Sequence, residues 1–475
     1  GKTFLVSSLI GNDTPLNLND PALTKHYIDF NQDHIDSETT AVVTRLTSKT
    51  NENTLPGKIL LKMISLEDLI AIYLNGYFLE GEAYRKETSQ DKLSQSMNEV
   101  KNILESKELN HNEGQYSSQL LNGFKKECKK FNKHYRSNIK ILDEFDTILS
   151  KVEYQDKDLS FVSLANLICY IWDNDPAISK SFKGHLNLLK SINYSETLYI
   201  DQTHLKQIIC LQNTVESDLD NISIPIQQNV IDINITDKQK KNLQQIVKEV
   251  VMPFTVKETD LLSKIDVLDF PGARSLGGAL VEKVTVKQLQ GLFKRGKIKH
   301  FFDSYVDSYD IEHLLLCTDR GNQEVVDLPL MVGEWYKSRD KNIKDKFHII
   351  FTKSDLMLVG DSDDQSNNER INAKFINIYE EFDSGLSLSK NWAKSEEPFN
   401  NFYFIINHTP SNIYRTDTHQ ILDDHIQTLD TFKQSFLRND MLKNIFNSNQ
   451  IKEKFDESFL SESGGIEHLL NTLNN

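Results

Sequence analysis

The chain opens with residue types that bind phosphate. Gly1-Lys2-Thr3, followed by the apolar run Phe4–Ile10, has the form of the last part of a phosphate-binding loop, GxxxxGK[ST], that runs into its helix. In such a loop the Lys2 ammonium contacts the β- and γ-phosphates, the Thr3 hydroxyl binds Mg²⁺, and the free N–H groups around Phe4 point at the phosphates. The tripeptide alone is a weak signal, because an ordinary helix start has the same residues.

A second phosphate contact is indicated by Ile265–Gly272, an apolar run that ends in Asp-Phe-Pro-Gly. A strand that ends at Asp269 would present this carboxylate beside the magnesium shell. The Gly272 N–H could approach a γ-phosphate closely, because glycine has no Cβ. A plain strand followed by a Pro-Gly turn is the alternative interpretation.

The run His348–Asp355 combines an apolar strand with Thr-Lys-Ser-Asp, a pattern typical of guanine recognition. Asp355 would accept hydrogen bonds from the N1–H and exocyclic amine of the base, while the stem of Lys353 packs on the ring. Adenine lacks this donor pair, so ATP would be disfavoured. The usual first residue of the pattern is Asn, and Thr352 in its place is expected to brace the loop less well.

Between the first two patterns lies Thr39–Arg45, where a first switch would fall. Thr44 could close over Mg²⁺ and the γ-phosphate and position the attacking water, so it is the candidate catalytic residue and a candidate metal ligand. A Thr-rich strand edge is the alternative. The four patterns occur in the order expected for a GTP/GDP site with Mg²⁺, each at a strand end or a helix start, and this order favours nucleotide binding.

Short β-branched or apolar runs bounded by turns are typical of buried strands. Helical or mixed segments separate them, which favours a mostly parallel sheet. The runs are Ala41–Leu46, Lys58–Ile64, Ile265–Leu268, His313–Cys317, Lys346–Thr352 and Phe402–Asn407.

A long Lys/Glu/Asn/Leu-rich segment interrupts these strands, with apolar residues at three- and four-residue spacing. The predicted fold is therefore an α/β, three-layer P-loop NTPase of the GTPase type, whose mostly parallel sheet lacks its first strand. Residues 1–64 form its first part, 65–250 a mainly helical insertion and 251–475 its second part. We expect residues upstream of Gly1 to supply the missing strand and to complete the phosphate loop.

Composition limits the remaining function classes. The net charge of −15 argues against broad nucleic-acid binding, which needs a basic face. The four cysteines have no zinc-site spacing and indicate a cytoplasmic protein with reduced thiols. The longest apolar run, Phe161–Trp172, is too short for a bilayer of about 30 Å, so any membrane contact would be peripheral.

Two charged segments have a functional and a plain interpretation. The basic run Lys294–Lys299 suggests binding to lipid headgroups, but the acidic total favours a solvated helix end. The polar segment Asp361–Glu369 superficially resembles a calcium loop. It has Ser366 where an EF-hand needs Gly and no closing Glu, so we interpret it as a solvated loop.

Val42–Arg45 (VVTR) resembles the first switch of dynamin-like GTPases. Four further segments are similar to SrfC-like bacterial virulence factors: Asp269–Ser275, Leu292–Tyr305, Leu314–Val325 and Gly464–Leu470. The resemblance implies a GTPase-like protein of the bacterial cytoplasm, with delivery to a host left open, and a larger parent protein. It implies nucleotide contacts by Lys2, Thr3, Thr44, Asp269, Gly272, Lys353 and Asp355.

Two functions remain open. One is a Mg²⁺-dependent GTPase whose hydrolysis resets a switch, coupled to self-association or to a protein partner through the helical insertion. The other is a catalytically inert nucleotide-fold scaffold that acts as a protein-interaction module. Ala273 favours the second, because Ras-like enzymes place their water-positioning Gln after the DxxG glycine.

Overall fold

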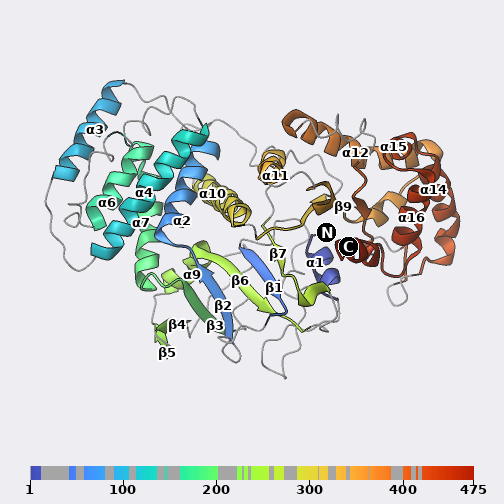
Figure 1. Cartoon of the computed structure of the whole chain (residues 1–475), viewed down its shortest axis with the longest axis horizontal. Coiled ribbons are helices and arrows are strands. Elements are labelled where there is room, and N and C mark those ends of the chain that lie inside the picture. The colour runs from blue at the N-terminus through green and yellow to red at the C-terminus, as the bar shows by residue number, and fades with distance from the viewer. Residues whose placement is uncertain are drawn as a thin grey trace.

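The chain is mixed α/β, with two separate β-sheets between two groups of helices (Figure 1). The computed structural model describes residues 2–11, 42–49, 58–80, 90–105, 114–135, 145, 147, 161–201, 222–226, 229–233, 237–255, 261–271, 286–308, 310–318, 328–338, 343–361, 363–386, 399–407, 413–415 and 420–474.

The larger sheet has seven strands in the order β5-β4-β3-β2-β6-β1-β7. They are β1 (Val43–Thr47), β2 (Lys58–Met63), β3 (Thr197–Asp201), β4 (Ile222–Ile226), β5 (Asn229–Ile233), β6 (Val247–Pro253) and β7 (Val267–Asp269). The smaller sheet has the order β10-β9-β8, from β8 (Leu314–Thr318), β9 (Phe347–Phe351) and β10 (Phe402–Phe404).

The prediction of a mostly parallel sheet is correct for the smaller sheet and wrong for the larger one. Both pairs of the smaller sheet are parallel. Among the described strands of the larger sheet, only the β1–β6 pair is parallel, while the other pairs are antiparallel. The β4–β5 connection is too short for a crossover, so these strands must run in opposite directions. A longer connection, such as the one between β2 and β3, allows the next strand to run in either direction.

One group of helices packs on the side of the larger sheet. It consists of α2 (Leu66–Asn75), which continues as the π-helix η2 (Gly76–Glu80), α3 (Gln90–Glu105), α4 (Gly114–Tyr135), α6 (Phe161–Cys169), the short η6 (Tyr170–Trp172) and α7 (Pro176–Ser191). We call this group the helical lobe. It comes from the segment predicted to be a mainly helical insertion, and the same segment also supplies β3, β4, β5 and α9 (Asp237–Ile246).

Helix α2 shows why the lobe folds as it does. Ser65 and Asp68 form a capping box, in which each side chain accepts a hydrogen bond from the backbone N–H of the other. Almost the whole helix is apolar, and its residues from Leu69 to Asn75 are buried. A helix that is apolar on all sides needs neighbours on all sides, and α2 has α4 and α10 (Val286–Asp307) as its main neighbours.

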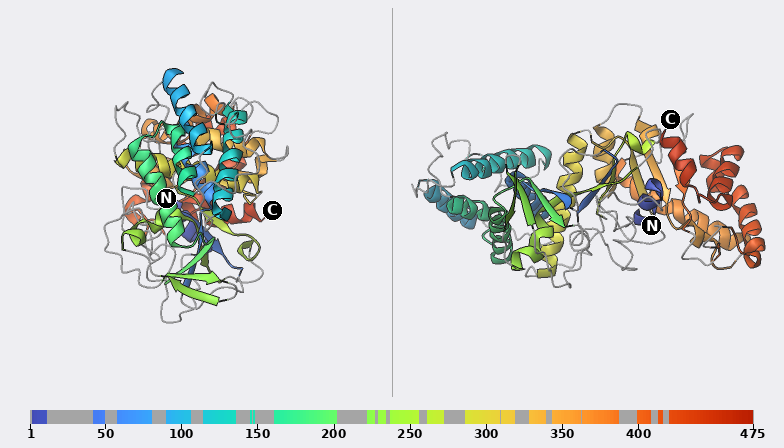
Figure 2. Two further views of the ribbon diagram at one scale, coloured as in Figure 1. Left: turned by 90° about the vertical axis from the view of Figure 1, so that its left-hand side faces the viewer. Right: turned by 90° about the horizontal axis from the view of Figure 1, so that it is seen from below.

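The other group of helices packs around the smaller sheet at the opposite end of the molecule (Figure 2). It consists of α11 (Leu328–Lys337), η9 (Ile343–Lys346), η10 (Ser354–Leu358), α12 (Asp364–Leu386), η11 (Asp423–His425), α14 (Ile426–Arg438), α15 (Asp440–Ile445), α16 (Ser448–Phe455), η12 (Asp456–Leu460) and α17 (Ile466–Leu473). The remaining elements are α1 (Lys2–Ile10) and η8 (Leu261–Ser263). All five residues of β9 are buried, as expected for a central parallel strand.

The interpretation of Asp361–Glu369 as a solvated loop is wrong for its second half. Helix α12 begins at Asp364, because the Asp363 side chain accepts hydrogen bonds from the Ser366 N–H and hydroxyl at 2.9 and 2.7 Å. An acidic residue that caps free N–H groups starts a helix in a segment whose composition suggested a loop. Among the described residues, no helix combines the length and apolar character needed to cross a membrane.

The segment between β2 and β6 begins and ends at adjacent positions of the larger sheet. The chain leaves β2 after Met63 and enters β6 at Val247, and these two residues are cross-strand partners. The next pair outward is joined by a hydrogen bond from the Ile64 N–H to the Ile246 carbonyl oxygen, 2.9 Å long. The entry and exit points therefore lie side by side, close to the predicted boundaries at residues 64 and 250, which themselves stay predictions.

Candidate functional site

Lys2 and Asp269, which are remote in the sequence, form an ion pair. The Lys2 Nζ lies 3.1 Å from Asp269 Oδ1, and the Asp269 side chain is fully buried. The Lys2 ammonium also donates a hydrogen bond to the carbonyl oxygen of Phe270. Lys2 is the first residue of α1 and Asp269 the last of β7, so the start of this helix lies at the end of this strand.

Thr44 lies directly opposite Asp269 in the antiparallel β1–β7 pair. Directly opposed residues present their side chains on the same face of a sheet, about 4.5–5.5 Å apart at Cβ. Thr44 is completely buried, and its hydroxyl has no hydrogen-bond partner in the described part of the chain. The structure therefore brings Lys2, Thr44 and Asp269 together.

The end of β8 belongs to the same neighbourhood. Burial raises the pKa of the Cys317 thiol to about 12, and the charges of Lys2 and Asp269 act on this group from nearby. Helix α1 is held against the smaller sheet by Leu5 and Leu9, which share a buried cluster with residues of β9, β10 and α17. The first turn of α1 thus lies near the carboxyl ends of both β7 and β8.

The Thr-Lys-Ser-Asp segment follows β9 at this same edge of the smaller sheet. The Thr352 N–H and hydroxyl both donate to the carbonyl oxygen of Thr318, at 3.0 and 3.1 Å, which joins the segment to the end of β8. Lys374 of α12 donates to the Thr352 carbonyl oxygen at 3.4 Å. Although Thr replaces Asn, its side chain therefore does brace the loop.

Asp355 is buried and held at the end of β10. The Asn407 N–H donates to Asp355 Oδ1 at 3.1 Å, and the Ser354 N–H donates to the Ile405 carbonyl oxygen at 2.9 Å. Lys353 adopts a left-handed backbone conformation, with φ of 53°, that turns the chain from the strand into η10. Asn407, the last residue of the predicted strand Phe402–Asn407, makes this contact through its backbone, so its residue type does not identify it as a partner of Asp355.

A comparison with known protein families matches this chain over residues 1–475 to the family described as "Putative bacterial virulence factor". The chain belongs to this family. The match confirms the virulence-factor part of the resemblance seen in Asp269–Ser275 and the other quoted segments. No curated protein matches the chain.

A network of charged side chains around the buried Glu249 lies behind Thr44, on the other face of β1. Arg45 Nε and Nη2 donate to the Glu249 carboxylate at 2.9 and 3.1 Å, and Arg45 Nη1 donates to Asp266 at 2.7 Å. Lys62 and the Tyr305 hydroxyl also contact Glu249. Burial opposes ionisation of Glu249, but these partners outweigh it, and the pKa of Glu249 stays below its usual value.

Arg45, Glu249 and Tyr305 are not among the site residues that the sequence motifs predict. A signal for Glu249 exists, because this carboxylate and Lys248 stand between the apolar residues Val247 and Val250–Met252 of a strand-like segment. A charge in a buried strand requires a partner of opposite charge. That partner comes from a strand about two hundred residues away and cannot be read from local sequence.

The structure says little about the contacts of four other predicted site residues. Gly1 and Gly272 lie outside the described residues. Thr3 and Phe4 are partly exposed in the first turn of α1, beside Lys2. Within the described ranges, no group of three or more His, Cys, Asp and Glu residues could hold a metal ion through protein side chains alone.

Proposed function

We propose that this chain binds a guanine nucleotide with Mg²⁺ and hydrolyses GTP, as a dynamin-like GTPase. The convergence of Lys2, Thr44 and Asp269 carries the proposal, because three remote segments supply the residue types that a phosphate–magnesium site requires. Ligands of open α/β sheets bind at the carboxyl ends of the strands. Asp269 lies at the carboxyl end of β7, where Lys2 contacts it, and Thr44 lies opposite Asp269 near the start of the antiparallel β1.

The phosphates would lie at the start of α1. This helix begins at Lys2, so its first N–H groups and the Lys2 ammonium provide positive charge at one point. Lys2 now neutralises Asp269, and an incoming triphosphate would attract the ammonium away from that carboxylate. Asp269 would then be available to a cation.

The oxygen donors around Asp269 fit Mg²⁺. Thr3, Thr44 and Asp269 offer two hydroxyls and a carboxylate, and Mg²⁺ prefers such hard oxygen ligands in combination with substrate phosphates. The Thr44 hydroxyl is buried next to Asp269 without a hydrogen bond among the described residues, so a cation or an ordered water would satisfy it. Bound Mg²⁺ would supply charge neutralisation of the β- and γ-phosphates.

The base would lie against the segment after β9. Asp355 Oδ1 accepts a backbone hydrogen bond from Asn407, which gives the carboxylate a defined orientation. A guanine offers two adjacent N–H donors to such a carboxylate, whereas adenine does not. Lys353, with its left-handed backbone, would place its stem along the ring.

The split between the two sheets supports a P-loop arrangement. Lys2 lies between Asp269 at the end of β7 and Cys317 at the end of β8, and these two strands are edges of their sheets. A strand that leads directly into α1 would have to end at Lys2, and hence between β7 and β8. We propose that such a strand pairs with both edges and joins the two sheets into one.

Nucleotide binding is tested by calorimetry on the full-length protein with GTP and with ATP, in the presence of Mg²⁺. Asp355→Asn should weaken GTP binding by about 30-fold, equivalent to about 2 kcal/mol for a lost charged hydrogen-bond pair. Asp361→Asn, in the exposed segment after η10, is the matched control and should bind as wild type. Equal affinity for GTP and ATP, or an unchanged affinity of Asp355→Asn, would refute guanine binding.

Hydrolysis is tested separately by phosphate release. We expect Thr44→Val to lower the rate by about 100-fold, the usual effect of removing one positioned group in an active site. If the wild-type protein binds GTP and releases no phosphate above background, the inert scaffold is the correct function. Ala273 at the position of the water-positioning Gln is the observation that favours this second function.

A further inference from the structure

Helix α10 contacts the candidate site through Phe270, the residue that follows Asp269. The Phe270 ring packs edge-on against Phe302 and Tyr305 of α10, with ring centroids 5.9 and 5.4 Å apart. The Phe270 carbonyl oxygen accepts the hydrogen bond from Lys2. A change at Lys2 or Asp269 therefore acts on a residue whose side chain is wedged against α10.

A second contact reaches α10 through β1. Thr44 and Arg45 are neighbours on this strand, so their side chains point to opposite faces. Thr44 faces Asp269, while Arg45 binds Glu249, which accepts a hydrogen bond from the Tyr305 hydroxyl of α10. The Arg45 guanidinium also lies over the Tyr305 ring, 5.9 Å from its centroid. Tyr305 thus takes part in both contacts.

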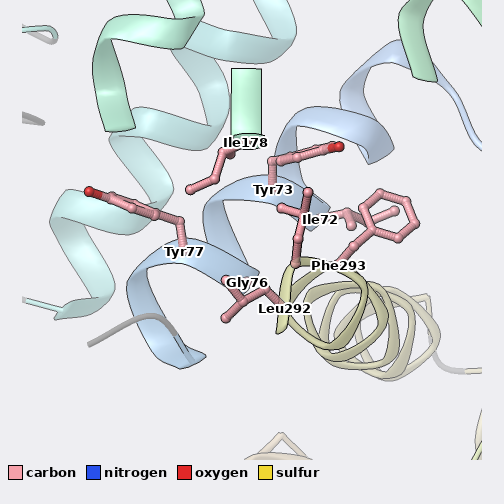
Figure 3. A pocket seen from close by; sticks show the side chains of 8 residues that line it. Ile72, Tyr73, Gly76, Tyr77, Ile178, Leu292 and Phe293 are labelled. Atoms are coloured by element: carbon pink, nitrogen blue, oxygen red, sulfur yellow. The ribbon is translucent and has the colours of Figure 1, made fainter. Parts of the chain in front are cut away.

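The opposite side of α10 lies against the helical lobe without space between the backbones. A Cβ on Gly296 would lie 2.0 Å from the Ile72 carbonyl oxygen, and a Cβ on Gly76 would lie 2.6 Å from the Leu292 carbonyl oxygen. His300 adds a hydrogen bond to Asp68 at the start of α2, with Nε2 2.6 Å from Oδ1. Figure 3 shows α10 against α2 and η2, next to a small apolar recess that Tyr77 also lines.

We propose that α10 transmits the nucleotide state of the site to the helical lobe, with Phe270 and Arg45 as its contacts to the site and the Gly76–Gly296 crossing as its contact to the lobe. This inference rests on the proposed nucleotide binding. Closely packed helices move as rigid elements between discrete arrangements, because their interface cannot deform continuously. A displacement of Phe270 or of β1 therefore moves α10, and α10 displaces α2 and η2.

The test is hydrogen–deuterium exchange of the full-length protein with and without GTPγS and Mg²⁺, with nucleotide affinity measured on the same samples. In the wild type, saturating nucleotide should change the exchange rate of Leu66–Glu80 by about fivefold or more, the lower limit of typical couplings between sites. Helix α14, which lies at the other end of the molecule, is the internal reference.

Tyr305→Phe removes only the hydroxyl that contacts Glu249, and Phe302→Leu reduces the aromatic packing on Phe270. Both variants should bind GTPγS within about threefold of wild type and lose the response in Leu66–Glu80, since coupling and affinity are separate free energies. Tyr336→Phe in α11 is the matched control and should respond as wild type.

The outcomes separate the two proposals. If GTPγS binds and Leu66–Glu80 does not respond, α10 is not a transmitting element, while nucleotide binding stands. If Tyr305→Phe and Phe302→Leu both respond as wild type, the route through α10 is wrong. If no nucleotide binds, both proposals fall together.

Discussion

Thr44 of β1 and Asp269 of β7 face each other across an antiparallel strand pair, and the Thr44 hydroxyl is buried without a hydrogen bond within the described ranges. A buried hydroxyl of this kind costs free energy in the folded state, so its presence needs a reason. A ligand that binds beside Asp269 would provide one. Stability and ligand binding should then respond in opposite directions to the loss of this hydroxyl.

We expect Thr44→Val to raise the free energy of unfolding of the nucleotide-free protein by about 1 kcal/mol, because the substitution keeps the shape and removes the unsatisfied group. Thr47→Val, on the same strand, should lower it by about 1 kcal/mol, since the Thr47 hydroxyl accepts a hydrogen bond from the Lys49 N–H at 3.1 Å. Urea unfolding at neutral pH measures both. In the presence of GTP and Mg²⁺ the Thr44→Val protein should gain less stability than wild type. If Thr44→Val and Thr47→Val lowered the free energy of unfolding by the same amount, this account of Thr44 would be wrong.

The glycine crossing gives a second prediction. Gly296→Ala should destabilise the protein by about 3 kcal/mol, because neither backbone of a packed helix pair can move away at low cost. The inserted Cβ would lie 2.0 Å from the Ile72 carbonyl oxygen and 2.7 Å from the Gly76 nitrogen.

Gly184→Ala is the matched control, since nothing lies within 4 Å of its added Cβ in helix α7. The free energy of unfolding of this variant should be about 0.5–1 kcal/mol higher than that of wild type, because alanine has a better helix propensity than glycine. Thermal unfolding of both variants compares them directly. A Gly296→Ala protein as stable as wild type would show that α2 and α10 do not pack this closely.

Lys297 gives a third prediction, on pH. Its ammonium is buried in α10 and donates to the carbonyl oxygen of Gln244 at 3.1 Å, and burial lowers the pKa of Lys297 to about 7. An unfolded lysine has a pKa of about 10.4, so between pH 7 and this value the unfolded chain binds more protons than the folded one. The contribution of Lys297 to the free energy of unfolding therefore rises with pH across that window, by up to about 1.4 kcal/mol per pH unit.

Lys297→Met has a side chain of similar length without the charge. We expect the variant to be more stable than wild type at pH 7, with a difference that shrinks as the pH rises toward 9. Urea unfolding of both proteins at several pH values measures this difference, and comparison with the variant removes the contribution of other groups that titrate at alkaline pH. A difference that is independent of pH would contradict the buried position of the ammonium.

Local sequence was sufficient for several elements. The runs around His348–Phe351 and Lys58–Met63 are strands as predicted, because β-branched and aromatic residues in a buried run favour extended backbone. The order of the motifs also predicts that Lys2 lies near Asp269. When strands and helices alternate along the chain, strand ends and helix starts lie at the same edge of a sheet, and these two residues occupy such positions. The ion pair between them agrees with that expectation.

Other features depend on partners that local sequence does not reveal. β6 lies between β1 and β2, and its central Glu249 is buried because Arg45 and Lys62 flank it from both neighbours. Neither the neighbours of a strand nor their direction follows from its own residues, so the antiparallel character of the larger sheet was missed. The close approach of α2 and α10 at Gly76 and Gly296 was missed for the same reason.

The Met63–Val247 pair has a consequence for the architecture of the molecule as a whole. The chain leaves β2 and enters β6 at adjacent positions, joined outward by the bond between Ile64 and Ile246. The nearly two hundred intervening residues, which include the helical lobe and strands β3, β4 and β5, therefore form a cassette that begins and ends at one point of the sheet. Such a cassette can be exchanged, enlarged or cut out by recombination without re-threading the strands on either side. A short β-turn in its place could connect β2 directly to β6. The edge of β2 that now pairs with β3 would then be an exposed strand edge that needs protection.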